Sequence, residues 1–390
     1  MIKGKNILLG VSGGIAAYKV LELCSRLKKE GANLKIIMTK SACEFISPLS
    51  FETMGKCIVY SDMFEGHHDR VYHIDLPKWA DVFLVAPLSA NTLSKITYGI
   101  ADNMLSASLL ACDKDIIVAP TMNTNMLNNE ATQENLKKIR DRGVHIINPN
   151  SGLLACDTTG DGRMEEPVNI VKYLDYYFTK KDLQGKKIIV SAGPTVEPID
   201  YVRYITNKSS GKMGYNIAIE AFKRGAEVKL ISGPVNPLDT DGIDKINIRT
   251  NKELKEAIEK EFDDCNALIM SAAPTDYKVK DVSDKKIKKN GNNLNLELIE
   301  NIDILKYFGN KKNNQILIGF AAETDDLIKN AKIKLESKKA DYIIANDLKK
   351  KGAGFDVDTN IASILSKDKV ERLDIMTKKE LANKILDLIV

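Results

Sequence analysis

The chain has 390 residues, of which 44% are hydrophobic and 28% charged, a composition typical of globular proteins. A single hydrophobic core rarely encloses so long a chain, so more than one domain is expected. Its 57 basic and 53 acidic side chains leave a net charge of +4, too even a balance to predict nucleic-acid or membrane partners. No apolar run approaches the ~20 residues of a membrane span, and the N-terminus runs into a strand and not a cleavage site, so we expect a cytoplasmic protein.

Short apolar runs alternate with helical patterns along the whole chain, which predicts parallel strands covered by helices. The runs are residues 6–12, 33–39, 81–87, 115–120 and 144–149, then 187–193, 227–233, 267–273, 315–322 and 341–347. Each run ends in small or polar residues, and ligands of open α/β sheets bind at the carboxyl ends of strands, so we expect two binding crevices. The polar stretch 178–187 predicts two doubly wound α/β domains, at residues 1–180 and 186–390.

The first predicted strand ends in a glycine-rich turn, Gly10-Val-Ser-Gly-Gly14, at the start of a helix. This turn is not the G-x-G-x-x-G fingerprint of dinucleotide sites, and the second strand ends in Met38-Thr39-Lys40 where that fingerprint needs an acidic residue. Helix N-terminal amides with the hydroxyls of Ser12 and Thr39 suit a phosphate group. Taken alone, the turn indicates tight packing as readily as binding.

Two later turns of the first half carry polar residues after a predicted strand. Ser89, Asn91 and Thr92 form the first of these turns, and they are more polar groups than one helix cap needs. Asn123 lies in the second, between Met122 and Met126. An amide among thioethers is either a satisfied loop residue or a donor aimed at a carboxylate in a dry pocket.

Five segments of the first half resemble the flavin-dependent cysteine decarboxylases: GVSGGIAAYK, VYHIDLPKWAD, PLSANT, PTMNTNM and ACDTTGDGRM. The resemblance implies that His73 is the catalytic histidine, Asn123 holds the substrate carboxylate and Cys156 protonates a late intermediate. Thr121 is a departure, because alanine is usual there. The resemblance also implies an FMN site at the first turn, with contacts from Ser12, Gly13, Thr39, Ser89, Asn91 and Thr92.

The reaction implied for the first half is an oxidative decarboxylation. The carboxylate of a cysteine residue leaves poorly because the resulting carbanion has no electron sink, and hydride transfer from the side chain to FMN creates one. An imidazole handles protons near neutral pH, and a thiol is a competent proton donor. Alone, His73 and Cys156 would more often be structural residues; the joint presence of five motifs favours catalysis.

The second half begins with a strand, a long loop that contains SSGKMG, and a helix. A P-loop would require glycine at 206 and serine or threonine at 213, where the chain has Thr206 and Met213, so we reject that motif. Ser209, Ser210 and Gly211 still predict an anion-binding helix start. The lysine-rich runs 285–289 and 332–339 have two interpretations. Most such runs are solvent-exposed surfaces, but two of them in a nucleotide-binding fold could instead bind the phosphates of a triphosphate.

The segment RYITNKSSGKMG is similar to the CTP-dependent phosphopantothenate–cysteine ligases, so the whole chain resembles the bifunctional decarboxylase/ligase family of coenzyme A biosynthesis. The resemblance implies that Asn207 binds an acyl-cytidylate and that Lys286, or Lys285 before it, is the catalytic lysine. Two departures concern the cytosine pocket: APTDY replaces Ala-Val-Ala-Asp-Tyr, and Ile302 replaces a common proline. The CTP contacts implied are Asp276, Lys286, Asn301, Ile302, Asp303, Ile304, Phe320, Lys334 and Lys338.

The implied ligation activates the carboxylate of 4′-phosphopantothenate with CTP, releasing pyrophosphate, and the amine of L-cysteine then displaces CMP. Lysines and Mg²⁺ would neutralise the phosphate charge, and we expect the triphosphate itself to hold the Mg²⁺. No metal-ligating residues are predicted. The six cysteines contain no Cys-x-x-Cys pair, which argues against a structural zinc site.

The resemblance also implies an architecture and an assembly: a flavodoxin-like first domain, a Rossmann-like second domain, and a homo-oligomer. Relatives form trimer-based dodecamers with the flavin site at subunit contacts, and their ligase domains are dimeric. Two other functions stay open. An NAD(P)-linked dehydrogenase lacks its fingerprint here, and a non-catalytic FMN-binding regulatory protein would not need His73, Cys156 or Lys286.

Overall fold

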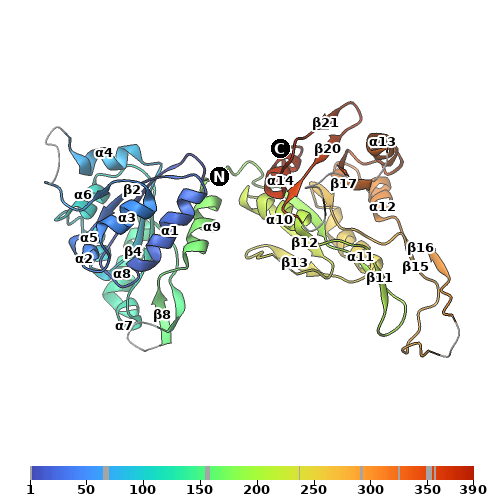
Figure 1. The fold of residues 1–390 in the computed structure, drawn as a ribbon, viewed down its shortest axis with the longest axis horizontal. Coiled ribbons are helices and arrows are strands. Elements are labelled where there is room, and N and C mark those ends of the chain that lie inside the picture. Colours follow the sequence, from blue (N-terminus) through green and yellow to red (C-terminus); the bar gives the residue numbers. More distant parts are fainter. Residues whose placement is uncertain are drawn as a thin grey trace. The chain divides into compact units, whose positions relative to one another are not determined.

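The structure, a computed structural model, describes residues 2–64, 70–153, 159–236, 238–289, 293–323, 326–347, 354 and 357–390. The chain divides into two compact units, Met1–Thr179 and Lys180–Val390, each with its own sheet and helices (Figure 1). Within this described part, no helix combines the length and apolar character that crossing a membrane requires.

The first unit is built on a six-stranded parallel sheet with the strand order β3-β2-β1-β4-β5-β6. The order reverses direction between β1 and β4, which is the switch point where doubly wound sheets bind ligands. A separate antiparallel hairpin pairs β7 with β8. The strands are β1 (Asn6–Val11), β2 (Asn33–Met38), β3 (Val59–Tyr60), β4 (Val82–Leu88), β5 (Ile116–Pro120), β6 (His145–Ile146), β7 (Asn150–Leu153) and β8 (Thr159–Arg163).

Helices cover both faces of this sheet. Along β1, Ile7 and Leu9 pack into one core and Leu8 packs into the other, and all three side chains are fully buried. A strand buried on both faces is apolar without alternation, which explains the continuous runs in the sequence. One face carries α1 (Ala17–Lys29), α3 (Pro48–Gly55) and α9 (Pro167–Phe178), and the other carries α4 (Tyr72–Trp79), α5 (Ala90–Tyr98), α6 (Met104–Leu110) and α8 (Glu130–Asp141). The short helices α2 (Lys40–Cys43) and α7 (Thr124–Asn128) follow β2 and β5.

The second unit contains an eight-stranded sheet with the order β13-β12-β9-β14-β17-β18-β20-β21, and its switch point lies between β9 and β14. The first six strands in this order are parallel, whereas β20 and β21 are antiparallel. Residues 366–369 are too short a connection between β20 and β21 for any other pairing. The strands are β9 (Lys187–Ala192), β12 (Glu227–Ser232), β13 (Asp244–Asn247), β14 (Ala267–Met270), β17 (Ile316–Glu323), β18 (Tyr342–Asp347), β20 (Ala362–Leu365) and β21 (Val370–Arg372).

The helices of the second unit also pack on two separate cores. One core takes α10 (Lys212–Lys223) and α14 (Lys378–Leu386), and the other takes α11 (Asn251–Phe262), α12 (Ile304–Lys311) and α13 (Leu327–Ser337). Gly214 brings α10 close to β9, because a Cβ there would lie 2.6 Å from the Cβ of Ala192. Two small hairpins complete the unit, β10 (Val196–Pro198) with β11 (Tyr204–Thr206) and β15 (Tyr277–Val279) with β16 (Leu298–Glu300). A further antiparallel pair joins β19 (Thr359–Asn360) to β22 (Met376–Thr377), with β20 and β21 between them in the chain.

The doubly wound α/β fold predicted for both halves is confirmed, and every apolar run named above coincides with a strand. Within that class, the first unit has the strand order 3-2-1-4-5-6 of Rossmann folds. The prediction of parallel strands did not include the antiparallel pair β20 and β21, nor the short strands β3 and β13. Strands of two to four residues carry too little periodicity to stand out in a sequence.

Candidate functional site

A cavity of about 500 Å³ opens at the carboxyl ends of β1, β2 and β4 in the first unit. The predicted crevice is therefore present, at the switch point of the sheet. The cavity is lined by Gly13, Thr39–Ser41, Ser61–Phe64, Ser89–Thr92, Lys95, Asp102–Met104 and Met126. This wall combines hydroxyl, amide and ammonium groups with aromatic and thioether side chains, a mixture that suits a phosphate ester bearing an apolar ring.

The glycine-rich turn after β1 lies directly against the segment after β2. A Cβ at Gly13 would lie only 2.5 Å from the Cβ of Ser41, so no larger residue fits there without moving the backbone. The fully buried Ser12 lies beneath the wall, where its hydroxyl donates to the carbonyl oxygen of Pro87 and accepts from the N–H of Ser89, both at 2.8 Å. Ser12 therefore joins two turns of the cavity without lining it.

Two predicted cofactor contacts are also helix caps. The Ser89 hydroxyl accepts from the N–H of Thr92 at 3.3 Å, and the Thr39 hydroxyl accepts from the N–H of Ala42 at 3.2 Å. Both residues still line the cavity, together with Thr92 and the exposed Asn91. Because an oxygen that accepts one bond retains a second lone pair, capping and ligand contact are compatible.

Two ion pairs on this wall were not predicted from the sequence. The Lys95 ammonium lies 2.9 and 2.6 Å from the two carboxylate oxygens of Asp102, and this contact lowers the pKa of Asp102 below its usual value. Lys40 pairs with Asp62 at 3.2 Å. Lys40 and Lys95 lie in or beside the quoted motifs, but only the helix orientation shows which side chains face the cavity.

The predicted catalytic residues of the first half are not on the described wall of this cavity. The partly buried His73 lies in the first turn of α4. Asn123 is the N-cap of α7, and its side-chain oxygen accepts from the N–H of Asn125 at 2.9 Å. Cys156 lies outside the described residues.

The hairpin of β7 and β8, which encloses position 156, is held beside Asn123. The N–H of Met122 donates to the carbonyl oxygen of Gly162 at 3.0 Å, and the Thr124 hydroxyl donates to that of Asp161 at 2.8 Å. Gly162 has a φ of +128°, and a Cβ there would lie 2.1 Å from the Met122 carbonyl oxygen. The turn that carries Asn123 is therefore in direct contact with the strand that follows the segment containing Cys156.

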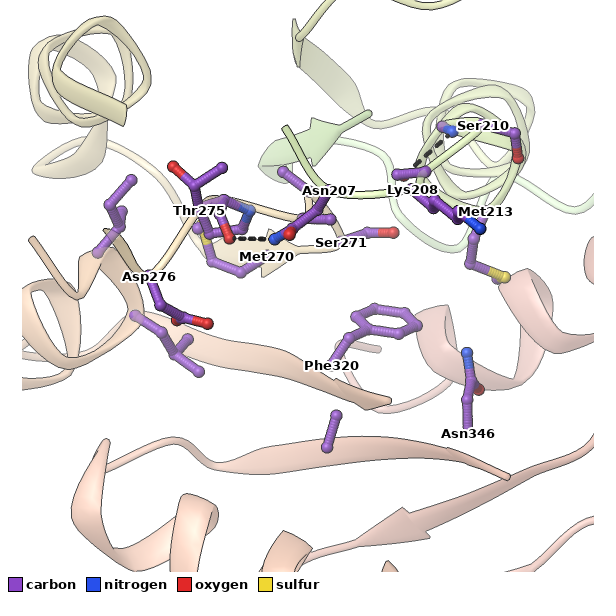
Figure 2. Close-up of a pocket in the computed structure, with 18 of the residues that line it drawn as sticks. Asn207, Lys208, Ser210, Met213, Met270, Ser271, Thr275, Asp276, Phe320 and Asn346 are labelled. Carbon is purple, nitrogen blue, oxygen red and sulfur yellow. Dashed lines mark hydrogen bonds between the residues drawn. The ribbon is translucent and has the colours of Figure 1, made fainter. Parts of the chain in front are cut away.

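A second cavity, of about 490 Å³, opens at the carboxyl ends of β14 and β17 in the second unit. Figure 2 shows Asn207 and Ser271 on one side of this pocket, with Phe320 and Asn346 opposite. Its charged lining consists of Lys208, Lys212, Lys334, Lys338 and Lys378 with Asp276 and Asp303. The excess of lysines makes the pocket electropositive, as binding of a triphosphate requires.

The predicted helix start lies on this wall. Ser209, Ser210 and Gly211 line the pocket, and Gly211 caps α10 with a φ of +72°. The N–H of Gly211 donates to the Ser209 hydroxyl at 3.4 Å. The N-terminus of a helix of twelve residues therefore faces the cavity, where its amides and dipole favour an anion.

Asn207 and Asp276 face the pocket from neighbouring segments. The Asn207 amide donates to the carbonyl oxygen of Pro274 at 2.8 Å (Figure 2). The carbonyl oxygen of Asp276 accepts from the N–H of Asn301 at 2.8 Å, and its carboxylate is exposed. Asn301 is not among the residues that line the pocket, and its amide nitrogen is buried without a partner in the described part of the chain.

The predicted CTP contacts Ile302, Asp303, Ile304, Phe320, Lys334 and Lys338 all line this cavity. Lys338 forms an ion pair with Asp303, and Lys334 donates to the carbonyl oxygen of Phe320 at 2.8 Å. Burial raises the pKa of Asp303, but the contacts with Lys338 and with the N–H of Lys306 outweigh it, so the net shift is downward. Asp303 is therefore ionised at neutral pH and holds Lys338 at the pocket.

Lys286 is exposed and is not among the residues that line the pocket. The segment that contains Lys286 is hydrogen-bonded to Asp200 and Arg203 through the neighbouring Ile287. The N–H of Ile287 donates to the Asp200 carboxylate at 3.1 Å, and its carbonyl oxygen accepts from Arg203 at 3.2 Å. Arg203 also pairs with Asp200 at 2.6 Å. Burial raises the pKa of Asp200, but hydrogen bonds from three backbone N–H groups and the charge of Arg203 have a larger, opposite effect. The net pKa is about 2, below the usual value of an aspartate.

Several pocket residues escaped prediction. Asn360 donates to the side-chain oxygen of Asn346 at 3.0 Å, and the buried Lys378 donates to the carbonyl oxygen of Gly354 at 3.1 Å. The sequence could have predicted Asn346, which lies at the polar end of a predicted strand. It could not have predicted Lys378, because this residue lies in α14, far in sequence from the predicted pocket residues. Among the residues that the structure describes, no group of three or more His, Cys, Asp or Glu side chains is arranged to hold a metal ion.

Two family models match the chain along nearly its whole length. Residues 1–179 match the Flavoprotein family, and residues 183–390 match the DNA/pantothenate metabolism flavoprotein C-terminal domain. The second match alone covers more than half of the chain.

Individual proteins are also similar to this chain over most of its length. The coenzyme A biosynthesis bifunctional protein CoaBC of Bacillus subtilis (strain 168) is 45% identical over 392 aligned residues, which cover 99% of this chain and 97% of the relative. A cysteine/cysteine sulfinic acid decarboxylase from an unknown prokaryotic organism is 42% identical, covering 87% of this chain and 98% of the relative. A crystal structure of the C-terminal domain of a coenzyme A biosynthesis bifunctional protein CoaBC is 40% identical, covers 53% of this chain and 95% of that chain, and has a TM-score of 0.46.

Both halves are thus matched in order, in a single relative that aligns from end to end at 45% identity. The chain belongs to the family of coenzyme A biosynthesis bifunctional proteins.

Proposed function

We propose that the chain catalyses two consecutive steps of coenzyme A biosynthesis in the cytoplasm. Residues 186–390 ligate L-cysteine to 4′-phosphopantothenate with CTP, and residues 1–180 decarboxylate the product to 4′-phosphopantetheine with FMN. The observation that carries this proposal is the pair of cavities at the two switch points, in a chain that aligns end to end with a bifunctional relative.

The first cavity fits FMN. The turn at Gly13 packs tightly against Ser41 and lines the cavity with a residue that has no side chain, and hydroxyls of Thr39, Ser89 and Thr92 lie on the same wall. Phe64 and Met126 offer apolar contacts for the ring, and Lys95 supplies positive charge that Asp102 holds in place. Bound FMN would accept two electrons before carbon dioxide leaves and return them to the product, so that 4′-phosphopantetheine forms with no other oxidant or reductant.

In the second cavity, the lysines and the start of α10 bind the phosphates, and the amide of Asn207 contacts the acyl-cytidylate. Asp303 keeps Lys338 oriented, and Phe320 provides an apolar face for the base. Lys286 lies outside the pocket, so its segment must move toward the ligand during ligation. Mg²⁺ enters with CTP, held by the triphosphate.

The enzyme acts as a homo-oligomer: a trimer-based dodecamer with dimeric ligase domains. His73 is absent from the described wall of the flavin cavity of its own chain, which supports a site completed by a neighbouring copy. The small hairpins of the second unit expose large apolar residues that a second copy would cover. Their exposed fractions are 87% for Tyr201, 54% for Tyr204, 51% for Tyr277 and 47% for Leu298.

The proposal is tested with purified protein incubated with 4′-phosphopantothenate, L-cysteine, CTP and Mg²⁺. We expect a yellow preparation that releases FMN, and formation of pyrophosphate, CMP, carbon dioxide and 4′-phosphopantetheine by mass spectrometry. Well-folded, flavin-loaded protein that performs neither step contradicts the proposal. A colourless preparation that uses a nicotinamide cofactor would favour the dehydrogenase instead.

A parallel reaction with free cysteine and cysteine sulfinic acid tests the second activity that a relative's name suggests. We expect no decarboxylation of either compound at the rate found for 4′-phosphopantothenoylcysteine, because the second unit would otherwise have no part in the reaction. Comparable rates on free cysteine would reassign the substrate of the first half.

Replacing Gly13 by alanine is expected to weaken FMN binding by about 10-fold or more, because the added methyl group forces the turn away from Ser41. The measurement is the flavin absorbance of protein dialysed against known FMN concentrations. Gly14 provides the matched control, since a Cβ there meets nothing within 4 Å. Equal flavin affinity in both variants would refute the role of this turn.

A further inference from the structure

Three buried polar residues lie behind the wall of the second cavity: Thr195, Asn251 and Thr275, which we call the buried triad. Their exposed fractions are 0%, 1% and 3%. Thr195 follows β9, Asn251 is the first residue of α11, and Thr275 follows β14. Only Thr275 lines the cavity, and the catalytic and CTP-binding residues proposed above do not include any member of the triad.

Asn251 makes three hydrogen bonds to two different segments. Its side-chain oxygen accepts from the Thr195 hydroxyl at 2.6 Å, and its amide nitrogen donates to the carbonyl oxygen of Thr275 at 2.9 Å. Its backbone N–H donates to the carboxylate of Glu197 at 2.8 Å. The triad is closed by the N–H of Thr275, which donates to the Thr195 hydroxyl at 3.1 Å. Asn251 therefore donates from one side-chain atom and accepts at another, whereas a hydroxyl carries both functions on a single oxygen and an aliphatic side chain has neither.

Each neighbour of the triad leads to a residue of the ligase pocket. The carbonyl oxygen of Thr195 accepts from the Thr206 hydroxyl at 2.8 Å, and Thr206 precedes Asn207. Thr275 lies between Pro274, whose carbonyl oxygen accepts from Asn207, and Asp276 (Figure 2). Asn251 thus adds a buried link between the two segments that carry Asn207 and Asp276. The segments also bond directly, through the Asn207 amide and through the N–H of Ala273, which donates to the carbonyl oxygen of Gly193 at 2.9 Å.

We propose that Asn251 is a positioning residue of the ligase site, which holds the segments of Asn207 and Asp276 in register across the pocket. The inference rests on the proposed ligase function. Without the Asn251 side chain, the Thr275 carbonyl oxygen and the Thr195 hydroxyl lose a buried partner, and both segments shift to recover one. The buried hydroxyl of Thr275 already has no hydrogen-bond partner in the described part of the chain, so loss of Asn251 would leave a second polar atom of Thr275 unpaired.

The test compares Asn251→Ala with Thr250→Ala in the full chain. Thr250 caps the same helix by accepting from the N–H of Glu253 at 3.2 Å, and its hydroxyl forms no hydrogen bond with the triad in the described part of the chain. For Asn251→Ala we expect the Kd of CTP by calorimetry and the KM of CTP to rise about 10-fold, the loss expected for buried partners left unmade. For Thr250→Ala we expect wild-type values. A purely structural defect would lower the active fraction in both variants and leave KM unchanged.

A second variant approaches the triad from the other side. Thr195→Val removes the hydroxyl that bridges Asn251 and Thr275 while keeping the side-chain shape. We expect it to raise the KM of CTP as well, and the double variant to be no worse than Asn251→Ala, because residues that act as one unit are not additive. If Asn251→Ala does not fold, Thr195→Val alone tests the role, since an unchanged KM of CTP in that variant would contradict it.

Decarboxylation of supplied 4′-phosphopantothenoylcysteine serves as the loading control, since it is carried by the other unit. A wild-type chain that does not ligate refutes the proposed function. A wild-type chain that ligates, beside an Asn251→Ala variant with unchanged Kd and KM for CTP, refutes the positioning role alone.

Discussion

Replacing His73 by asparagine is expected to abolish decarboxylation and to leave ligation within about two-fold of wild type. The amide keeps the approximate size of the imidazole but cannot take up and release a proton near neutral pH, and such proton transfer contributes about 10²–10⁴-fold. The measurement supplies 4′-phosphopantothenoylcysteine directly and follows carbon dioxide and 4′-phosphopantetheine, so that ligation does not limit the rate.

His145→Asn is the matched control. This histidine lies in β6 of the same unit, where its ring packs against that of Tyr177 with a centroid distance of 5.6 Å. We expect it to retain decarboxylase activity and full flavin content. An active His73→Asn enzyme would remove His73 from the catalytic set, and loss of ligation in that variant would show that the two units are not independent.

Replacing Lys286 by glutamine is expected to lower ligation by about 10²–10³-fold, the usual cost of removing one group that stabilises transition-state charge. Decarboxylation of supplied 4′-phosphopantothenoylcysteine should be unchanged. The effect is expected although Lys286 lies outside the pocket, because we propose that its loop moves toward the ligand. In the described part of the chain this loop is held at Ser283, whose N–H donates to the carbonyl oxygen of Ile199 at 3.1 Å, and at Ile287, which bonds to Asp200 and Arg203. The measurement is CTP-dependent release of pyrophosphate.

Lys285→Gln is the control and also identifies which lysine acts. Lys285 is held by Ser283, whose hydroxyl donates to its carbonyl oxygen at 2.7 Å. We expect this variant to remain within about three-fold of wild type, as an exposed lysine without a ligand contact would. The reverse pattern would assign the catalytic role to Lys285, and two active variants would exclude both lysines from it.

The fold was predictable because its strands are buried on both faces. Runs such as residues 6–12 and 187–193 have apolar centres without alternation, and this pattern arises in sheets that helices cover on both sides. The antiparallel edge of β20 and β21 was not predictable in the same way, because its pairing depends on a short connection and not on hydrophobic pattern.

The candidate sites were predictable where a motif lies at the end of a strand. Gly13, Thr39 and Ser89 could be named in advance because small and polar residues at the carboxyl ends of parallel strands meet at the switch point. Asn207 follows the antiparallel strand β11 and was named only from the family resemblance. By itself, the sequence therefore determined the two-domain α/β class, the two crevices and part of their lining.

Only the tertiary structure decided how those residues are held and which others join them. The sequence does not show that Ser12 is buried beneath the first cavity, or that His73 and Lys286 lie away from the described cavity walls. The Asn251 contacts are equally hidden, because Thr195 and Thr275 are distant in sequence and meet only when β9 and β14 pair. The local hydrophobic pattern of a sequence predicts which residues are buried and where strands end. Hydrogen bonds between distant segments form only when the folded sheet brings those segments together.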